Sequence, residues 1–162
     1  MAKDYLTGKR VLVVDDEPDV VETAKTLLTM CEVRGATSFS EASELLETEE
    51  FDIAVLDIMG VDGYALLEIA NRRGVTAVML TAHALSPDNI VKSFKGGAAS
   101  YLPKDKLADL ALFLNEILED KIKGKRLSFR WLERWATFYD KKFGPDWQKE
   151  DKEFWKKFKY WV

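Results

Sequence analysis

The chain has 162 residues, 47% of them hydrophobic and 32% charged, which suits a globular domain with an appendage. No long stretch is both apolar and uncharged, so we predict no transmembrane helix. Residues 1–9 contain no apolar signal core, so we expect no secretion. Cys31 is the single cysteine, which excludes an internal disulfide, and we expect a cytoplasmic protein.

The charge is distributed unevenly along the chain. Residues 1–120 contain 11 Lys and Arg against 22 Asp and Glu, a formal charge of −11. Residues 121–162 contain 13 against 6, a formal charge of +7, together with all five Trp. We therefore divide the chain into an acidic body, residues 1–122, and a basic, Trp-rich helical tail, residues 123–162.

The body alternates short apolar runs with segments of helical periodicity. We predict strands over residues 10–15, 32–36, 51–57, 75–81 and 98–102, each followed by a helix. Among the helix starts, Ser40 is predicted to be an N-cap. Five such βα units indicate an α/β fold, a doubly wound parallel sheet with helices on both faces. We expect the flavodoxin-like strand order, which the sequence itself does not dictate.

Polar residues stand where four of these strands end. Asp15 and Asp16 follow the first strand, Asp57 ends the third, Thr81 ends the fourth, and Lys104 follows the fifth. Ligands of parallel sheets bind beyond the carboxyl ends of the strands. We therefore expect three acids, one hydroxyl and one ammonium group to meet at one edge of the sheet.

This set of groups can hold a divalent cation and a phosphoryl group. Two carboxylates 4 Å apart repel each other by about 4 kcal/mol at an effective dielectric constant near 20. Mg²⁺ relieves such repulsion and prefers oxygen ligands. One carboxylate can then attack phosphorus, and Asp57 is the predicted nucleophile because it stands alone at the end of a buried strand. Lys104 and Thr81 can hold the phosphoryl oxygens. The alternative is that Asp15 and Asp16 merely cap the first helix.

Several stretches of the chain resemble a known family in their order and spacing. Residues of about 9–120 resemble the response-regulator receiver domain of two-component signalling, through the stretches Val11-Leu12-Val13-Val14-Asp15-Asp16-Glu17-Pro18, Val55-Leu56-Asp57-Ile58-Met59, Asp62-Gly63-Tyr64, Met79-Leu80-Thr81-Ala82, Lys95-Gly96-Gly97-Ala98 and Tyr101-Leu102-Pro103-Lys104.

The resemblance implies a phosphoprotein that acts in signal transduction. Asp57 would accept a phosphoryl group from a sensor histidine kinase or a phosphotransfer protein. Mg²⁺ would be bound by Asp15 or Asp16, by Asp57 and by the backbone carbonyl of Met59. The chain would catalyse its own phosphorylation and dephosphorylation, with Asp57 and Lys104 as the catalytic pair, and carry no separate effector enzyme.

The resemblance also implies a switch. Thr81, Ala82 and Lys104 would contact the phosphoryl group. Tyr101 would be the aromatic residue that turns inward when Thr81 moves. The signal would then leave the domain through protein–protein contacts.

Two departures from the family pattern affect the site. Asp57 and Asp62 are five positions apart with no proline between them, where the family has seven positions and a proline. This shortening alters the loop that carries the Met59 carbonyl. Lys104 is followed by Asp105 where the family commonly has a proline after a cis bond. We expect either a trans bond with an adjusted loop or a strained cis bond.

Other functions of the body fit the sequence less well. A flavin site needs a phosphate loop rich in Ser, Thr or Gly, whereas this chain has Asp15-Asp16-Glu17-Pro18 after its first strand. A phosphatase needs a general acid or base, and only Asp16 is evident. His83, the single histidine, lies near the mouth of the site, and we favour an exposed loop residue over a catalytic one.

The tail is predicted to be a helical hairpin. Ser128 is its expected N-cap, Gly144-Pro145 ends the first helix, and Asp146 begins a second helix that extends to Trp161. Such a hairpin is too small to bury its own aromatic residues, so we predict that it packs on protein.

Three interpretations of the tail remain open. It docks on its own receiver or on that of a second copy, giving a homodimer, through aromatic burial and opposite charge. It binds another protein and releases it on phosphorylation. Or the protein is a phosphorylation-regulated nucleic-acid or membrane-surface binder that acts through its basic, aromatic tail. No DNA-binding module is recognisable.

Overall fold

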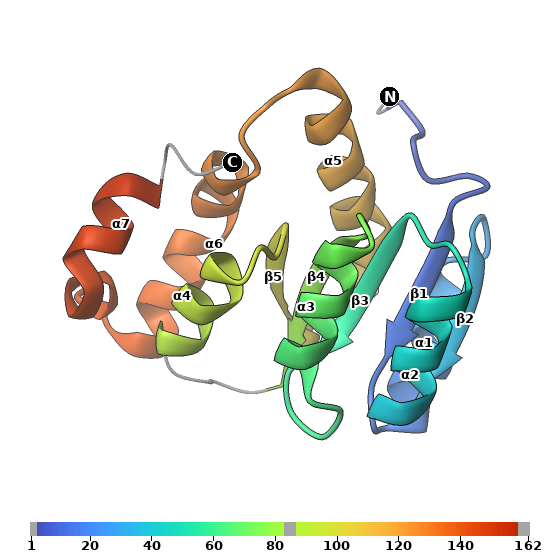
Figure 1. The fold of residues 1–162 in the computed structure, drawn as a ribbon. Coiled ribbons are helices and arrows are strands. Elements are labelled where there is room, and N and C mark those ends of the chain that lie inside the picture. Colours follow the sequence, from blue (N-terminus) through green and yellow to red (C-terminus); the bar gives the residue numbers. More distant parts are fainter. Residues whose placement is uncertain (1–2, 83–86, 159–162) are drawn as a thin grey trace.

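The computed structural model describes residues 3–82 and 87–158 (Figure 1). The elements in this part of the chain are, in order, β1 (Arg10–Val14), α1 (Pro18–Leu27), β2 (Glu32–Ala36), α2 (Phe39–Thr48), β3 (Ile53–Asp57), α3 (Gly63–Arg72), β4 (Thr76–Thr81), α4 (Pro87–Lys95), β5 (Ser100–Pro103), the 3₁₀ helix η1 (Lys104–Asp109), α5 (Leu110–Lys123), α6 (Leu127–Phe143), the 3₁₀ helix η2 (Trp147–Asp151) and α7 (Lys152–Phe158).

The five strands form one parallel sheet in the order β2-β1-β3-β4-β5, so the predicted flavodoxin-like order is confirmed (Figure 1). The connection from β1 to β2 runs in one direction along the sheet, and the connections from β3 to β5 run in the other. Right-handed crossovers therefore place α1 and α3 on opposite faces. In agreement, α1 contacts α5 while α2 contacts α3.

The three central strands form the core. Every residue of β3 and β4 is buried, as are Val11–Val14 of β1. A parallel strand covered on both faces needs apolar side chains in continuous runs, and such runs are what the sequence shows. The rigid packing of these strands fixes where their carboxyl ends lie.

Several predicted boundaries shift by a few residues. The N-cap of α2 is Ser38 and not Ser40, because Ser38 is the extended residue whose hydroxyl accepts the backbone N–H of Glu41 at 3.2 Å. Helix α6 begins at Leu127, so Ser128 lies in its first turn and Arg126 is at the N-cap position. No cis peptide bond occurs between described residues, so the bond from Lys104 to Asp105 is trans.

The tail carries one buried aromatic stripe. Trp131, Trp135 and Tyr139 lie four residues apart on α6 and are each less than 5% exposed. Each ring meets one ring of the body, in the pairs Trp131–Phe94 (5.1 Å between centroids), Trp135–Phe113 (5.3 Å) and Tyr139–Tyr101 (6.0 Å). Phe94 belongs to α4, Phe113 to α5 and Tyr101 to β5, so α6 covers the surface formed by these three elements, here called the α4–β5–α5 face.

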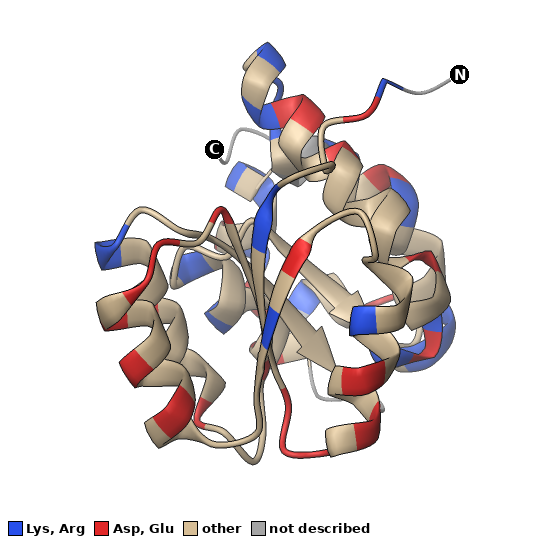
Figure 2. Cartoon of the chain, turned by 90° about the vertical axis from the view of Figure 1, so that its right-hand side faces the viewer, with Lys and Arg blue, Asp and Glu red and all other residues tan. Residues whose placement is uncertain are grey.

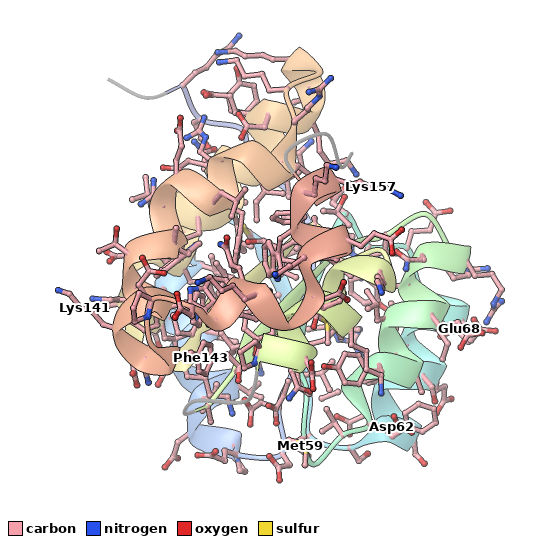
Figure 3. The ribbon with its side chains drawn as sticks, turned by 90° about the vertical axis from the view of Figure 1, so that its left-hand side faces the viewer. Met59, Asp62, Glu68, Lys141, Phe143 and Lys157 are labelled. Atoms are coloured by element: carbon pink, nitrogen blue, oxygen red, sulfur yellow. The ribbon has the colours of Figure 1, made fainter. Side chains whose placement is uncertain are left out.

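Helix α7 extends the same packing. Phe154 and Phe158 are buried, and Phe158 lies 4.7 Å from Phe94 between ring centroids. Figure 3 shows α6 and α7 lying across one side of the body, with Met59 and Asp62 at its lower edge. The predicted packing of the tail on protein is confirmed, and the surface is that of its own body.

Opposite charges accompany the aromatic contacts. Arg130 of α6 pairs with three acids of α5, Glu116 at 3.2 Å, Glu119 at 3.6 Å and Asp120 at 2.9 Å. Arg134 pairs with Glu116 as well, at 2.8 Å. On the far side of the body, the helices beside β2 carry mostly acidic residues (Figure 2). The predicted charge complementarity between body and tail is therefore present at the contact.

Candidate functional site

The sheet topology brings the predicted site residues to one edge. Asp15 directly follows β1, Asp57 ends β3, Thr81 ends β4 and Lys104 directly follows β5. Their strands are hydrogen-bonded neighbours, with Val14 beside Leu56, Asp57 beside Leu80 and Thr81 beside Pro103. Asp15, Asp57 and Thr81 are less than 5% exposed.

The ammonium group of Lys104 lies among three carboxylates. Its Nζ atom is 2.7 Å from Oδ2 of Asp15, 3.4 Å from Oδ1 of Asp57 and 3.6 Å from Oε1 of Glu17. The Lys104 side chain is only 12% exposed, so water screens these pairs weakly. In this structure Lys104 is therefore closer to Asp15 than to the predicted nucleophile.

Burial and neighbouring negative charge raise the pKa values of Asp15 and Asp57. Burial, together with the neighbouring charge of Asp15, raises the pKa of Asp57 to about 7, although Lys104 opposes the shift. Burial also raises the pKa of Asp15, again against the effect of Lys104. Burial alone would lower the pKa of Lys104, but its contacts with Asp15 and Asp57 outweigh that effect and raise it. The cluster thus holds more negative charge than one ammonium group can balance.

The donor set of this edge fits a hard divalent cation. Carboxylate oxygens of Asp15, Asp16 and Glu17 lie within 4.8 Å of one another, with Asp15 buried and the other two exposed. Oxygen ligands at a partly open position suit Mg²⁺, which keeps several of its waters. Glu17 was not among the predicted ligands, and its sequence signal is its place directly after the two aspartates. Metal binding by Asp57 and by the Met59 carbonyl stays a prediction.

The shortened loop after Asp57 folds back tightly on the site. Gly60 adopts a φ of 83°, and a Cβ there would collide with the Asp16 carboxylate. A Cβ on Gly63 would collide with the backbone carbonyl of Asp57. Asp62 is the only described non-glycine residue with positive φ, at 52°. Met59 is 63% exposed, so its side chain is not packed into the site.

The two predicted switch residues lie behind the acidic cluster. The hydroxyl of Thr81 donates a long hydrogen bond of 3.4 Å to the backbone carbonyl of Ala82. Ala82 itself is half-buried. Tyr101 is fully buried, and burial raises the pKa of its hydroxyl while the nearby Thr81 hydroxyl opposes the shift. His83 lies outside the described residues, so its predicted role has no structural account.

Comparisons with known proteins decide the family. The model of the response regulator receiver domain matches residues 11–114. The chain belongs to this family. Its fold also matches the receiver domain protein (CheY-like) from Methanospirillum hungatei, with a TM-score of 0.65, 31% identity, and coverage of 72% of this chain and 98% of that one. The tail lies beyond the matched residues.

Curated relatives include two-component response regulators. The chain is 33% identical to the response regulator ARR10 of Arabidopsis thaliana, over 62% of this chain and 19% of the relative. It is 37% identical to the transcriptional activator PfeR of Pseudomonas aeruginosa, over 65% of this chain and 36% of the relative. The chain therefore spans between about a fifth and a third of these relatives. None of its described helices is long and apolar enough to cross a membrane.

The raised pKa of Asp57 predicts that removing its charge stabilises the fold. A carboxyl with a raised folded-state pKa favours folding at low pH, and this contribution is lost as the pH rises from about 4 to about 7. At pH 8 without divalent cations, Asp57→Asn should raise the free energy of unfolding by roughly 1–3 kcal/mol. The gain should shrink towards pH 5, where wild-type Asp57 is protonated.

Urea denaturation at the two pH values measures this difference. Asp109→Asn, at an exposed position whose side chain makes no capping hydrogen bond to α5, is the matched control and should change stability by less than about 0.5 kcal/mol. Equal or lower stability of Asp57→Asn at pH 8 would contradict the account of the charge cluster.

Proposed function

We propose that this receiver domain accepts a phosphoryl group on Asp57 from a histidine kinase or phosphotransfer protein, in a Mg²⁺-dependent reaction. The observation that carries the proposal is the buried Asp57 carboxylate at the end of a central strand, 3.4 Å from the Lys104 ammonium and beside a cluster of acids. A receiver domain implies a histidine kinase as partner. It is not an enzyme with a separate substrate, so the chain promotes a reaction on itself.

The transfer step needs an ionised, correctly placed carboxylate. An oxygen of Asp57 attacks the phosphorus of a phosphohistidine, and the new O–P bond forms as the P–N bond breaks. The electron pair of that bond stays on the imidazole nitrogen of the donor, and Asp57 becomes an acyl phosphate. Mg²⁺ held by Asp15, Asp16 and Glu17 would favour the ionised carboxylate and neutralise the phosphoryl oxygens.

Two groups of the chain would hold the phosphoryl group after transfer. Lys104 is within reach of Asp57, and its ammonium can leave Asp15 to donate to a phosphoryl oxygen. The Thr81 hydroxyl can donate to a second oxygen, because its present hydrogen bond to Ala82 is long and weak. Movement of Thr81 changes the surroundings of Tyr101, which is the proposed start of the conformational relay.

The output is proposed to pass through protein–protein contacts in the cytoplasm, with residues 1–122 as the receiver unit and residues 123–162 as an appended helical unit. The alternative, a nucleic-acid or membrane-surface binder, needs free positive charge on the tail. Arg130, Arg134 and Lys142 pair with acids of the body, so these three charges are already engaged by protein. These pairs favour the protein-contact proposal.

Direct phosphorylation tests the assignment of Asp57. With Mg²⁺ and a small phosphodonor such as acetyl phosphate, the full chain should gain one acid-stable, base-labile phosphoryl group by intact-mass measurement. Asp57→Asn should gain none, and Asp109→Asn should be labelled like the wild type. Labelling of Asp57→Asn at the wild-type level would move the phosphoacceptor elsewhere.

Cation binding tests the acidic cluster separately. A ligand at 100 times its dissociation constant stabilises a fold by about 2.7 kcal/mol, so millimolar Mg²⁺ should raise the melting temperature. The shortened loop leads us to expect weaker binding than is usual in this family. Glu17→Gln should reduce the Mg²⁺-dependent rise, whereas Glu44→Gln, at an exposed position on α2, should preserve it. A melting temperature insensitive to Mg²⁺ in the wild type would argue against a working metal site.

A further inference from the structure

We propose that a cleft at the amino-terminal end of the sheet binds a small organic anion, in which a carboxylate is attached to an apolar body. The cleft has a volume of about 410 Å³, which lies within the range of ligand sites in proteins. It is lined by Thr76, the first residue of β4, whereas Asp57 stands at the opposite, carboxyl end of β3. The inference therefore does not rest on phosphorylation.

One wall of the cleft is the connection between α5 and α6. Gly124 ends α5 with a φ of 69°, and nothing lies within 4 Å of the place where its Cβ would stand. The backbone N–H of Lys125 donates to the carbonyl of Asp120 at 2.8 Å, which holds the turn closed. Leu127 then begins α6 and lines the same cleft.

This wall belongs to the extension of the chain. Figure 1 shows the connection from α5 to α6 at the top of the molecule, the end at which the strands start. The family model matches residues 11–114, so residues 124–127 lie outside it. The cleft is therefore a feature that the tail adds to this receiver domain.

The opposite wall is apolar. It consists of residues around the starts of β4 and β5, among them Val75, Ala77, Ala98 and Ala99. The backbone N–H groups of Val75, Ala98 and Ala99 already donate to carbonyls of the body. This wall therefore offers methyl groups to a ligand, and the charged end of a ligand must be met by side chains.

Two ammonium groups supply that charge. Lys121 and Lys125 both line the cleft, and none of the described lining residues is acidic. In the described part of the chain neither lysine pairs with an acid, whereas Lys123 between them pairs with Glu119 at 3.8 Å. Asp120, the acid next to Lys121, is held at 2.9 Å by Arg130 of α6. Positive charge therefore collects at the cleft without an acid to neutralise it.

The position of Lys121 distinguishes this arrangement from an ordinary helix end. A lysine in the last turn complements the helix dipole wherever it lies near the last carbonyls. Lys121 instead reaches across to β4, where its Nζ donates to the hydroxyl of Thr76 at 2.6 Å. Thr76 is only 8% exposed, and because its oxygen accepts this bond, its own proton can be donated to a ligand.

These groups define the chemistry of the ligand. A carboxylate oxygen accepts a charge-assisted hydrogen bond from Lys121 and a second bond from the Thr76 hydroxyl. Lys125 adds positive charge from the connection on the other wall. The apolar body of the ligand then lies against Val75, Ala98 and Leu127. A bare inorganic anion would leave this apolar surface unused, and a neutral molecule would leave the two ammonium groups unused.

An NMR titration of the full chain with benzoate, at constant ionic strength, tests the proposal. The amide resonances of Gly97, Gly124 and Lys125 should shift saturably, with a dissociation constant of about 10 mM or below, as expected for a fragment of this size. Benzamide, which has the same shape without the charge, should bind at least about 10-fold more weakly. Inorganic phosphate, which lacks the apolar body, should also bind at least about 10-fold more weakly. The absence of saturable shifts, or equal binding of benzamide or phosphate, would overturn the assignment.

Substitutions locate the bound anion. Lys121→Met and Lys125→Met should each weaken benzoate binding by at least about 3-fold, the effect of one partly exposed charge. Lys125→Met leaves the bond from Lys121 to Thr76 in place, so a loss shared by both variants reports the charge and not that bond. Lys123→Met, which removes the same charge beside the cleft but outside its lining, is the matched control and should bind like the wild type. Wild-type affinity in both cleft variants, or an equal loss in Lys123→Met, would overturn the proposal.

A last variant separates this cleft from the phosphoacceptor edge. Asp57→Asn should bind benzoate with the affinity of the wild type, because Asp57 lies at the other end of the sheet. Changed affinity in Asp57→Asn, with shifts at Thr81 in place of Gly124, would assign benzoate to the acidic edge and overturn the inference. The proposed phosphorylation of Asp57 would be unaffected by either result.

Discussion

The ammonium group of Lys104, held between Asp15 and Asp57, is the interaction on which this structure depends. Two buried carboxylates at the ends of neighbouring strands repel each other, and one cation makes their burial tolerable. The balance is incomplete, since the pKa of Asp57 is still raised to about 7. A site in this state gains stability when further positive charge arrives. That property suits the proposed Mg²⁺-dependent phosphorylation of Asp57.

The position of Lys104 in the chain connects the charge cluster to the rest of the molecule. It directly follows β5, the strand that carries Tyr101, and directly precedes Asp105, which touches the tail. Movement of a single ammonium group can therefore reach the tail without a long pathway. The trans bond between Lys104 and Asp105 shows that this chain places the lysine without the cis bond to proline that the family commonly uses.

Much of the site could be predicted because parallel α/β sheets obey a simple rule. Strand ends meet at one edge, so Asp15, Asp57, Thr81 and Lys104 were placed together by periodicity alone. Glu17 was missed because an exposed acid at the start of a helix is indistinguishable in sequence from a favourable dipole contact.

Other features depend on backbone angles or on long-range contacts that periodicity does not reveal. The backbone angles at Ser38 decided which of two nearby serines caps α2. The missing residues after Asp57 were visible in the sequence, but the contact of Gly60 with Asp16 was not.

The packing of the tail also depends on contacts that the sequence does not reveal. Its aromatic stripe and its charge predicted packing on an acidic protein surface. Which surface it covers depends on the fit of Trp131, Trp135 and Tyr139 to rings from three separate elements. The sequence shows each ring but not their arrangement in space. That arrangement places the tail over Tyr101.

The indole N–H resonance of Trp131 reports most directly on the link between Asp57 and the tail. In an NMR titration with Mg²⁺ and beryllofluoride, which stands in for the phosphoryl group, this resonance should shift, because the indole N–H donates to the backbone carbonyl of Tyr101. Trp131→Phe assigns the signal, and the amide of Thr81 reports occupancy of the site. The account predicts that both signals change together. A Thr81 amide that shifts while the Trp131 indole stays in place would contradict it.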